Sequence, residues 1–380
     1  MKAVTYQGIL NVEVKNVPDP VIQLPDDMIV RVTATSICGS DLHLYHGMIP
    51  SLEKDYVIGH EAVGIVEELG REVTGLKKGD KVVIPFTIGC GHCFYCENGL
   101  ESQCDEANKE EKPEVGAMFG CSRLYGDYFG SQAEWLRVPF ANFTRFKVPE
   151  DNGLSDEVLV LLADAIPTAY WGVTNAGVKP GDTVIVIGSG PIGLLTQKFS
   201  WLKGASRVIA IDRISYRLEH AKSTNAVEVY NFEETNELSD LLLELTKGGA
   251  DVVIDCVGAS GKMTPFEFAE TALFLQGGGL TAIKMSAQVV RKGGVVQLVG
   301  VYGLRYNSFP LGDFFARNIT LKMGYAPAIH HTPYLYELLM KEKIKVDDLI
   351  THHMPLIDAK KAYQVFNKRK DHCLKIILKP

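Results

Sequence analysis

A glycine triplet that follows an apolar run constrains the fold of this 380-residue chain most strongly. The residues TVIVIGSGPIG place Gly188, Gly190 and Gly193 directly after a run that is typical of a buried strand. This G-x-G-x-x-G spacing brings a pyrophosphate onto the N-terminus of a helix. The next apolar run, RVIAID, ends at Asp212, where an acid can bind the 2′-hydroxyl of an adenosine ribose. Strand, triplet, helix and acid in this order predict a Rossmann dinucleotide-binding domain.

Apolar runs further along the chain extend the predicted domain. The runs DVVIDC and GVVQLVGV, with helical segments between them, indicate more strands of a parallel sheet. From about Asn318 the pattern becomes mixed, and we expect helices near 332–342 and 358–368 before a final strand, CLKIILKP. This tail can rejoin the N-terminal part of the chain, which would leave the nucleotide domain as an insertion.

The N-terminal part is predicted to form a small β-barrel. Residues 1–35 alternate apolar and polar side chains, and short runs broken by glycines follow them. A helix is expected over 155–177, with Ser155 as its cap. Pro167 is expected to kink or divide that helix, because proline removes a backbone donor and clashes with the preceding turn.

Four closely spaced cysteines predict a metal site. Cys90, Cys93, Cys96 and Cys104 follow the spacing C-x2-C-x2-C-x7-C. Four thiolates in one short loop can complete a tetrahedron around Zn²⁺ and leave no open position, which is the property of a structural site. A redox C-x-x-C is the alternative, but the additional cysteines and the lack of an adjacent βαβ pattern favour zinc. The polar run 105–114 is expected to be a solvated loop.

A second set of residues has the character of a catalytic metal site. Cys38 and His60 are each followed within three residues by a carboxylate, Asp41 and Glu61. A catalytic zinc takes three protein ligands of this kind and keeps one open position, and its histidine needs a carboxylate to orient it. Asp164 lies in the apolar run LVLLADA, where a carboxylate is unfavourable unless it is paired or binds a metal. The alternatives are a buried cysteine, a packed histidine and a capping or salt-bridging aspartate.

Composition narrows the classes of function. The length suggests two domains, and 46% hydrophobic with 22% charged residues is typical of a soluble globular protein. A net charge of −7 argues against a nucleic-acid or anionic-membrane partner. We find neither a signal peptide nor an apolar run long enough to span a bilayer, and we expect a cytoplasmic protein.

These residues together resemble the zinc-containing alcohol dehydrogenases of the medium-chain dehydrogenase/reductase family. The resemblance covers nearly the whole chain: CGSDLH, GHEAVGIVEELGREVTGLKKGDKVV, the four-cysteine lobe, GSGPIG and the terminal strand. It implies an α/β two-domain protein with the active site in the cleft between the domains. A GroES-like β-barrel catalytic domain with a structural zinc lobe would span 1–166, and a doubly wound Rossmann NAD-binding domain would span 167–320. Residues 321–380 would return to the catalytic domain.

The resemblance also implies roles for individual residues near the catalytic zinc. The zinc ligands would be Cys38, His60 and Asp164. Asp41 would hold His60, and Glu61 would lie behind the metal as an outer or exchanging ligand. Ser40 would take the proton of the alcohol, and His43, whose reference pKa is about 6.5, would pass it on towards solvent.

Further residues are assigned by the same resemblance to the cofactor and the substrate, with two zinc ions and one NAD per chain. Thr168 would pack beside the nicotinamide, Lys375 could reach the pyrophosphate and Phe86 would line the substrate pocket. The cofactor-binding residues would be Thr168, Gly188, Gly190, Pro191, Ile192, Gly193, Asp212, Arg213, Val301 and Lys375. Judged from the sequence pattern alone, Arg213 has the character of an exposed charge rather than a ligand of a 2′-phosphate.

One residue departs from the best-known family members. Asp164 stands where they carry cysteine, and the stretches LADAIPTAYWG and FGSQAEWLRVPFAN resemble the glutathione-independent formaldehyde dehydrogenase branch. Oxygen is a harder ligand than a thiolate and should leave the zinc more electrophilic.

The implied function is reversible oxidation of an alcohol to an aldehyde or ketone, with hydride transfer to NAD. The resemblance leaves open whether the substrate is a simple alcohol, formaldehyde, a polyol, a diol or a threonine-type alcohol. Zinc-free quinone or enoyl reductases of the same superfamily lack Cys38, His60 and the cysteine lobe. A non-enzymatic, zinc-stabilised binding protein on the same fold is the remaining alternative. We expect a homo-oligomer, with a tetramer favoured.

Overall fold

The computed structural model describes residues 1–49, 51–108, 115–151, 153–261, 267, 278–303 and 306–380. The chain forms two compact units. The first unit contains Met1–Pro167 and Ala326–Pro380, and the second contains Thr168–Tyr325. These limits fall one and five residues from the predicted boundaries at 166 and 320. Residues 109–114 of the predicted solvated loop lie outside the described residues.

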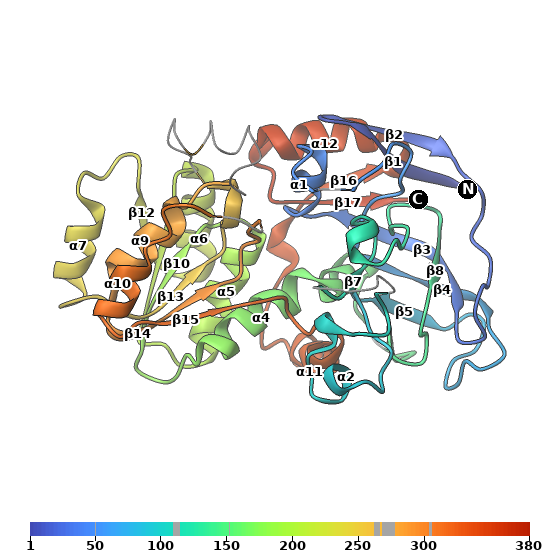
Figure 1. Ribbon diagram of the computed structural model, residues 1–380, viewed down its shortest axis with the longest axis horizontal. Coiled ribbons are helices and arrows are strands. Elements are labelled where there is room, and N and C mark those ends of the chain that lie inside the picture. The colour runs from blue at the N-terminus through green and yellow to red at the C-terminus, as the bar shows by residue number, and fades with distance from the viewer. Residues whose placement is uncertain (50, 109–114, 152, 262–266, 268–277, 304–305) are drawn as a thin grey trace. The chain divides into compact units, whose positions relative to one another are not determined.

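The first unit is built on a seven-stranded sheet in the order β16-β17-β3-β4-β5-β9, with β8 paired to β3. Its strands are β3 Met28–Ile37, β4 Ala62–Leu69, β5 Lys81–Ile84, β8 Trp135–Val138, β9 Phe146–Lys147, β16 Ile350–Pro355 and β17 Lys375–Lys379. Two smaller sheets pair β1 Lys2–Gly8 with β2 Asn11–Asn16, and β6 Thr87–Ile88 with β7 Ala117–Met118. The predicted tail strand, β17, pairs antiparallel with β3, so both chain ends lie in this unit (Figure 1).

Short helices cover the sheets of the first unit. The α-helices are α1 Asp41–Tyr45, α2 Phe94–Glu97, α3 Asp156–Leu159, α11 Ala328–Met340 and α12 Ala359–Lys368. The 3₁₀ turns are η1 Glu101–Gln103, η2 Arg123–Tyr125, η3 Val160–Ala163, η5 Asp347–Leu349, η6 Leu356–Asp358 and η7 Lys370–His372. Helix α12 buries Ala359, Ala362, Tyr363 and Phe366, because the spacing i, i+3, i+4, i+7 places them on one face. That face packs into the core formed with β1, β3 and β17.

The segment predicted as one helix over 155–177 is divided, but not at the predicted residue. Ser155 caps α3 as expected, and its side chain accepts a hydrogen bond from the Val158 N–H. The break lies at Asp164, whose φ of −149° and ψ of −65° are not helical. Helix α4, Ala165–Ala176, starts directly afterwards. Pro167 falls within its first turn, where backbone N–H groups have no partner inside the helix, so the division predicted at Pro167 is wrong.

The second unit is a six-stranded parallel sheet in the order β12-β11-β10-β13-β14-β15. Its strands are β10 Thr183–Ile187, β11 Arg207–Asp212, β12 Glu228–Asn231, β13 Ala250–Asp255, β14 Val290–Leu298 and β15 Thr320–Met323. Besides α4, its helices are α5 Pro191–Leu202, α6 Ser215–Asn225, α7 Leu238–Leu245, α9 Thr281–Val289 and α10 Leu311–Ala316, with the turn η4 Gly258–Ser260. The chain winds outward in both directions from β10 and β13 (Figure 1). This is the Rossmann topology, in which ligands bind at the carboxyl ends of the two central strands.

The central strands of this unit read as continuous apolar runs because both of their faces are covered. Ile185, Ile209, Val253 and Val296 are fully buried and belong to one core cluster. No helix among the described residues is both long and apolar enough to cross a membrane.

Candidate active site and metal centres

Four side chains that the sequence placed in a catalytic metal site meet in the first unit. Cys38, His60, Glu61 and Asp164 are buried, and one ligand atom from each lies within 4.8 Å of the others. Cys38 follows β3, while His60 and Glu61 immediately precede β4, the antiparallel neighbour of β3. Asp164 reaches them from the break between η3 and α4. The non-helical backbone at Asp164 therefore directs its carboxylate towards Cys38 and His60.

The spacing of these atoms fits a tetrahedral zinc ion. Bond lengths of about 2.3 Å to sulfur and about 2.0–2.2 Å to nitrogen or oxygen hold the ligand atoms about 3.3–3.8 Å apart. The Oδ2 atom of Asp164 lies 3.2 Å from Cys38 Sγ and 3.4 Å from His60 Nε2. A thiolate, a carboxylate and a neutral imidazole also balance the charge of Zn²⁺. Burial, followed by the Asp164 carboxylate, raises the pKa of the Cys38 thiol when no cation is bound.

Glu61 is the fourth member of the cluster, but its two oxygens have other partners. Oε1 accepts a hydrogen bond from Lys375 Nζ at 2.6 Å, and Oε2 accepts from the Ser36 hydroxyl. Lys375 is only 2% exposed. Burial opposes its charge, yet the Glu61 carboxylate raises its pKa above the ordinary value. In the structure the ammonium group of Lys375 is bonded to Glu61. Its contact with a pyrophosphate stays a prediction.

The imidazole of His60 lies against Asp41, the carboxylate that the sequence suggested would hold it. His60 Nδ1 lies 3.2 Å from Asp41 Oδ1, so the opposite nitrogen, Nε2, faces Cys38 and Asp164. Burial alone would lower the pKa of His60, but the Asp41 and Asp164 carboxylates raise it well above its usual value. A dication at Nε2 replaces that proton, which is the competition expected at a metal site.

The proposed proton path starts close to this cluster. The Ser40 hydroxyl lies 3.2 Å from His60 Nε2, on the same side as the metal ligands. His43 is buried in α1, and burial followed by the nearby His46 lowers its pKa to about 4. The sequence suggested a pKa near 6.5 for His43. A helix of five residues is too short for its sequence pattern to show which side chains are buried. His43 is therefore a neutral imidazole at pH 7.

The cysteine loop forms a second cluster in the same unit. Cys90, Cys93, Cys96 and Cys104 lie within ligand distance of one another. Their Sγ atoms are 3.9 Å apart for Cys90–Cys96 and 3.8 Å for Cys93–Cys104. Sulfurs bound tetrahedrally at about 2.3 Å are separated by about 3.8 Å. This donor set fits a closed structural zinc site.

The predicted substrate residue Phe86 also lies near the catalytic cluster. Its ring centroid is 6.3 Å from that of His60, and the two rings are inclined at 76°. The Phe86 N–H donates to the carbonyl of Ala163, which ties the segment between β5 and β6 to the residue before Asp164. An aromatic ring at this position can form an apolar wall beside the metal ligands.

The glycine triplet occupies the carboxyl end of β10, as predicted. Gly188 has a φ of +94°, which favours glycine, and Pro191 is the first residue of α5. A Cβ atom on Gly193 would lie 1.8 Å from the carbonyl oxygen of Gly188, so only glycine permits this close approach. Ile192 lies between them in the first turn of α5. The half-buried start of this helix is the expected position of a pyrophosphate.

Asp212 ends β11 beside the glycine loop. Its Oδ2 atom accepts from the Ser189 N–H at 2.6 Å, and its Oδ1 accepts from the Arg213 and Ile214 N–H groups at 2.7 and 3.0 Å. Asp212 therefore also holds the loop that would cradle the phosphates.

The other predicted cofactor residues occupy separate positions in the second unit. The side chain of Arg213 lies 3.9 Å from Glu233 and is one-third exposed. Val301 follows β14, and its carbonyl accepts from the Ala259 N–H. Thr168 is half-buried in α4.

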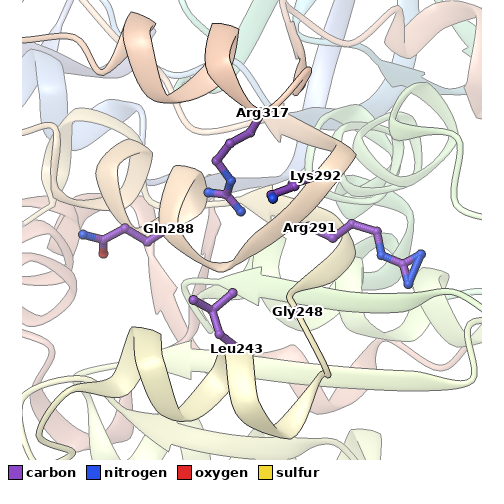
Figure 2. Close-up of a pocket in the computed structure, with 6 residues that line it drawn as sticks. All are labelled: Leu243, Gly248, Gln288, Arg291, Lys292 and Arg317. Atoms are coloured by element: carbon purple, nitrogen blue, oxygen red, sulfur yellow. The ribbon is translucent and has the colours of Figure 1, made fainter.

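A hollow of about 700 Å³ lies at the opposite, amino-terminal edge of the parallel sheet. It is lined by Leu243, Gly248, Gln288, Arg291, Lys292 and Arg317 (Figure 2). Arg317 donates to the carbonyls of Ala287 and Val290, and Arg291 pairs with Asp251. These two guanidinium groups support the fold, and we assign no ligand to the hollow.

Three polar residues behind the catalytic cluster were missed by sequence reasoning. Ser36, Gln132 and Tyr363 are buried and connect to Glu61 or Asp41 through hydrogen bonds. Gln132 is 91 residues from Asp41, and Tyr363 is 231 residues from Gln132. No local spacing marks such contacts, which arise only when distant strands and α12 pack together.

Comparison with known proteins agrees with this arrangement. Residues 24–150 match the alcohol dehydrogenase GroES-like domain, and residues 191–265 match the zinc-binding dehydrogenase family. The chain is 58% identical over 380 residues to the uncharacterized zinc-type alcohol dehydrogenase-like protein AdhB of Bacillus subtilis (strain 168), covering 100% of both chains.

Two further comparisons extend the match. The chain is 31% identical over 385 residues to the glutathione-independent formaldehyde dehydrogenase of Pseudomonas aeruginosa (strain LESB58), covering 96% of this chain and 94% of that protein. The solved structure of alcohol dehydrogenase TADH from Thermus sp. ATN1 has a TM-score of 0.85 at 34% identity and covers 100% of this chain and 99% of that one.

The fold and site define a dehydrogenase class built from a GroES-like unit with metal ligands and a Rossmann unit. The chain belongs to the zinc-type alcohol dehydrogenases of the medium-chain dehydrogenase/reductase family. It is an oxidoreductase of a zinc-binding family whose Rossmann unit takes a nicotinamide cofactor. The fold class and the enzyme class predicted from the sequence are confirmed.

Two zinc ions per chain are expected, one in each cluster. Cys38→Ser should lose one zinc and keep the cysteine-loop zinc, because the two donor sets share no residue. Asp164→Ala should show the same pattern, and Cys104→Ser is the matched variant that should lose the other ion. Zinc is measured by elemental analysis after gel filtration. A single zinc in the wild type that survives Cys38→Ser would contradict the two-site assignment.

The buried His43 predicts a pH-dependent stability. The pKa of His43 is about 4 in the folded chain and about 6.5 in the unfolded chain. Its contribution to the free energy of unfolding is therefore complete above pH 6.5 and is lost as the pH falls towards 4. Relative to His43→Gln, the wild type should lose about 3 kcal/mol more unfolding free energy between pH 7 and pH 4. Denaturant titrations measure this difference, with His372→Gln as the exposed control. Parallel pH curves for wild type and His43→Gln would contradict the burial of a neutral His43.

Proposed function

We propose that this protein catalyses reversible oxidation of an alcohol to an aldehyde or ketone, with transfer of a hydride to NAD. The observation that carries the proposal is the ligand cluster of Cys38, His60 and Asp164, whose atoms are spaced for zinc while both oxygens of Glu61 are engaged elsewhere. Three ligands leave one position for a substrate oxygen, which separates a catalytic site from a structural one.

When bound, zinc supplies a Lewis acid for the alcohol oxygen and the nicotinamide ring accepts the hydride. The chain's residues orient the substrate and move its proton. Ser40 Oγ lies beside His60 Nε2 and is the group that takes the hydroxyl proton. His43, neutral at pH 7, passes that proton on. Phe86 supplies an apolar wall, so that the carbon that loses hydride is shielded from water.

NAD is proposed as the preferred cofactor. The carboxylate of Asp212 lies at the end of β11. It would accept a hydrogen bond from a ribose 2′-hydroxyl and repel a 2′-phosphate. Thr168, Val301 and Lys375 remain proposed contacts of the cofactor, and Arg213 is the proposed residue flanking the ribose.

Formaldehyde is the specific substrate candidate that one observation favours, reacting as its hydrate, a gem-diol that loses one hydride and one hydroxyl proton to give formic acid. The relative from Pseudomonas aeruginosa is named as a glutathione-independent formaldehyde dehydrogenase and aligns over 96% of this chain. The cluster also has an aspartate as its third ligand, with a single cysteine. Polyols, diols and threonine-type alcohols are the alternatives from the same family, and a zinc-stabilised binding protein is the non-enzymatic one.

We further propose that the protein is a cytoplasmic homo-oligomer, with a tetramer favoured.

A substrate panel tests the proposed function. NADH formation should be measured with primary and secondary alcohols, diols, polyols, L-threonine and formaldehyde, with no glutathione added. At least one compound should give NADH in the wild type, and Cys38→Ser should give none. Cys373→Ser is the control, because that buried thiol lies outside both clusters. Two-zinc protein that reduces neither NAD nor NADP with any compound would contradict the proposal.

Asp212 should determine cofactor preference. Loss of a charge-assisted hydrogen bond costs about 1.5–3 kcal/mol, so NAD should be preferred over NADP at least tenfold and Asp212→Ala should remove that preference. Asp182→Ala is the matched control, because Asp182 also bonds a backbone N–H but lies before β10, at the other end of the strand. Steady-state kcat/KM with both cofactors gives the ratio. An unchanged ratio in Asp212→Ala would overturn the assignment.

A further inference from the structure

We infer that Gln132 and Tyr363 are positioning residues for the catalytic zinc ligands, acting through Asp41. The inference rests on the zinc-binding part of the proposed function and extends it to residues outside the ligand cluster. Both side chains are fully buried, and neither contacts the ligand atoms directly.

Asp41 controls two ligands at once. Its Oδ2 atom accepts from the backbone N–H of Cys38 at 2.9 Å, and its Oδ1 atom lies 3.2 Å from Nδ1 of His60. Within the described residues, Oδ1 has no hydrogen-bond donor of good geometry. The Cys38 N–H therefore holds Oδ2, and Oδ1 is the oxygen that is turned to His60.

Gln132 holds that orientation. Its Nε2 donates to Asp41 Oδ2 at 3.1 Å and to the carbonyl of Ser36 at 3.1 Å. Its backbone is tied on both sides, because its carbonyl accepts from the Val4 N–H and its N–H donates to the carbonyl of Ile58. The carboxylate cannot rotate without losing the Gln132 donor.

The amide of Gln132 has little freedom to move away. A Cβ atom on Gly59 would lie 2.4 Å from Gln132 Cγ, so the glycine before His60 leaves room for this side chain. The backbone beside His60 and the side chain that orients Asp41 therefore pack against each other.

Tyr363 holds the other end of the amide. Its hydroxyl donates to Gln132 Oε1 at 2.9 Å, so the amide oxygen points to α12 and the amide nitrogen points to Asp41. A flipped amide would place its oxygen against the Ser36 carbonyl and the Asp41 carboxylate, which are both acceptors. The C-terminal segment thereby contributes to a site whose ligands all precede residue 165.

The chain of contacts runs from Tyr363 through Gln132 and Asp41 to His60 and Cys38. An outer partner that contacts the ligating histidine directly, here Asp41, raises its basicity and fixes its ring, and removal of such a partner lowers metal affinity about 10–100-fold. Gln132 and Tyr363 act on the ligands through Asp41. Loss of the Tyr363 hydroxyl should therefore weaken zinc at this site alone.

Zinc release to a chromogenic chelator tests the inference without substrate or cofactor. The full-length, two-zinc protein should release its ions in two phases, and Cys38→Ser should identify the catalytic one by removing it. Tyr363→Phe should accelerate the catalytic phase about tenfold or more and leave the cysteine-loop phase unchanged. Gln132→Met, which removes the amide, should do the same if Tyr363→Phe does not fold.

Tyr56→Phe is the matched control. Tyr56 lies in the same core cluster as Tyr363, and its buried hydroxyl donates to the Tyr128 carbonyl at 2.8 Å instead of to Gln132. It should leave both release phases at the wild-type rate. Wild-type release in Tyr363→Phe or Gln132→Met, or equal acceleration of both phases, would overturn the inference. Absence of turnover in the substrate panel would refute the proposed reaction and leave this result standing.

Discussion

Buried negative charge at one end of the barrel is the constraint on which the rest of the site depends. Cys38, Glu61 and Asp164 meet within ligand distance at a largely buried position, where uncompensated charges are strongly unfavourable. Lys375 compensates Glu61 through an ion pair at 2.6 Å. The thiolate of Cys38 and the carboxylate of Asp164 are left for a dication. The ion pair with Lys375 thus distinguishes Glu61 from the metal ligands, although Glu61 belongs to the same cluster.

The ion pair of Glu61 also requires the C-terminal segment to pack against the N-terminal sheet, because that segment carries Lys375. Lys375 opens β17, which pairs with β3, the strand that leads into Cys38. Tyr363 lies on α12, which packs on the same core. The segment Ala326–Pro380 therefore completes a site whose ligands come from the first half of the chain. A cofactor unit inserted between these two segments leaves the metal cluster and its supports together in one unit.

Local patterns carried much of this structure, and long-range contacts carried the rest. Strand, glycine triplet and Asp212 are neighbours in sequence, so their relation was predictable from spacing alone. The cysteine loop was predictable for the same reason. The sequence predicted the helix break at Pro167, because proline is a known helix breaker. The break lies at Asp164 instead, where the carboxylate joins residues that are distant in sequence, and local patterns do not report such contacts. The pKa of His43 and the partners of Lys375 depend on burial, which helix and strand periodicity do not report for single polar residues.

The identity of the third ligand sets the hardness of the catalytic metal, because Asp164 supplies an oxygen in place of a second sulfur. Extended X-ray absorption fine structure, recorded on protein with cobalt in the catalytic site and zinc in the cysteine site, tests it most directly. We expect one sulfur at about 2.3 Å, with the remaining ligands being nitrogen or oxygen at about 2.0–2.2 Å. Two sulfurs around the cobalt would contradict it, because Cys38 is the single cysteine in the cluster that the structure describes.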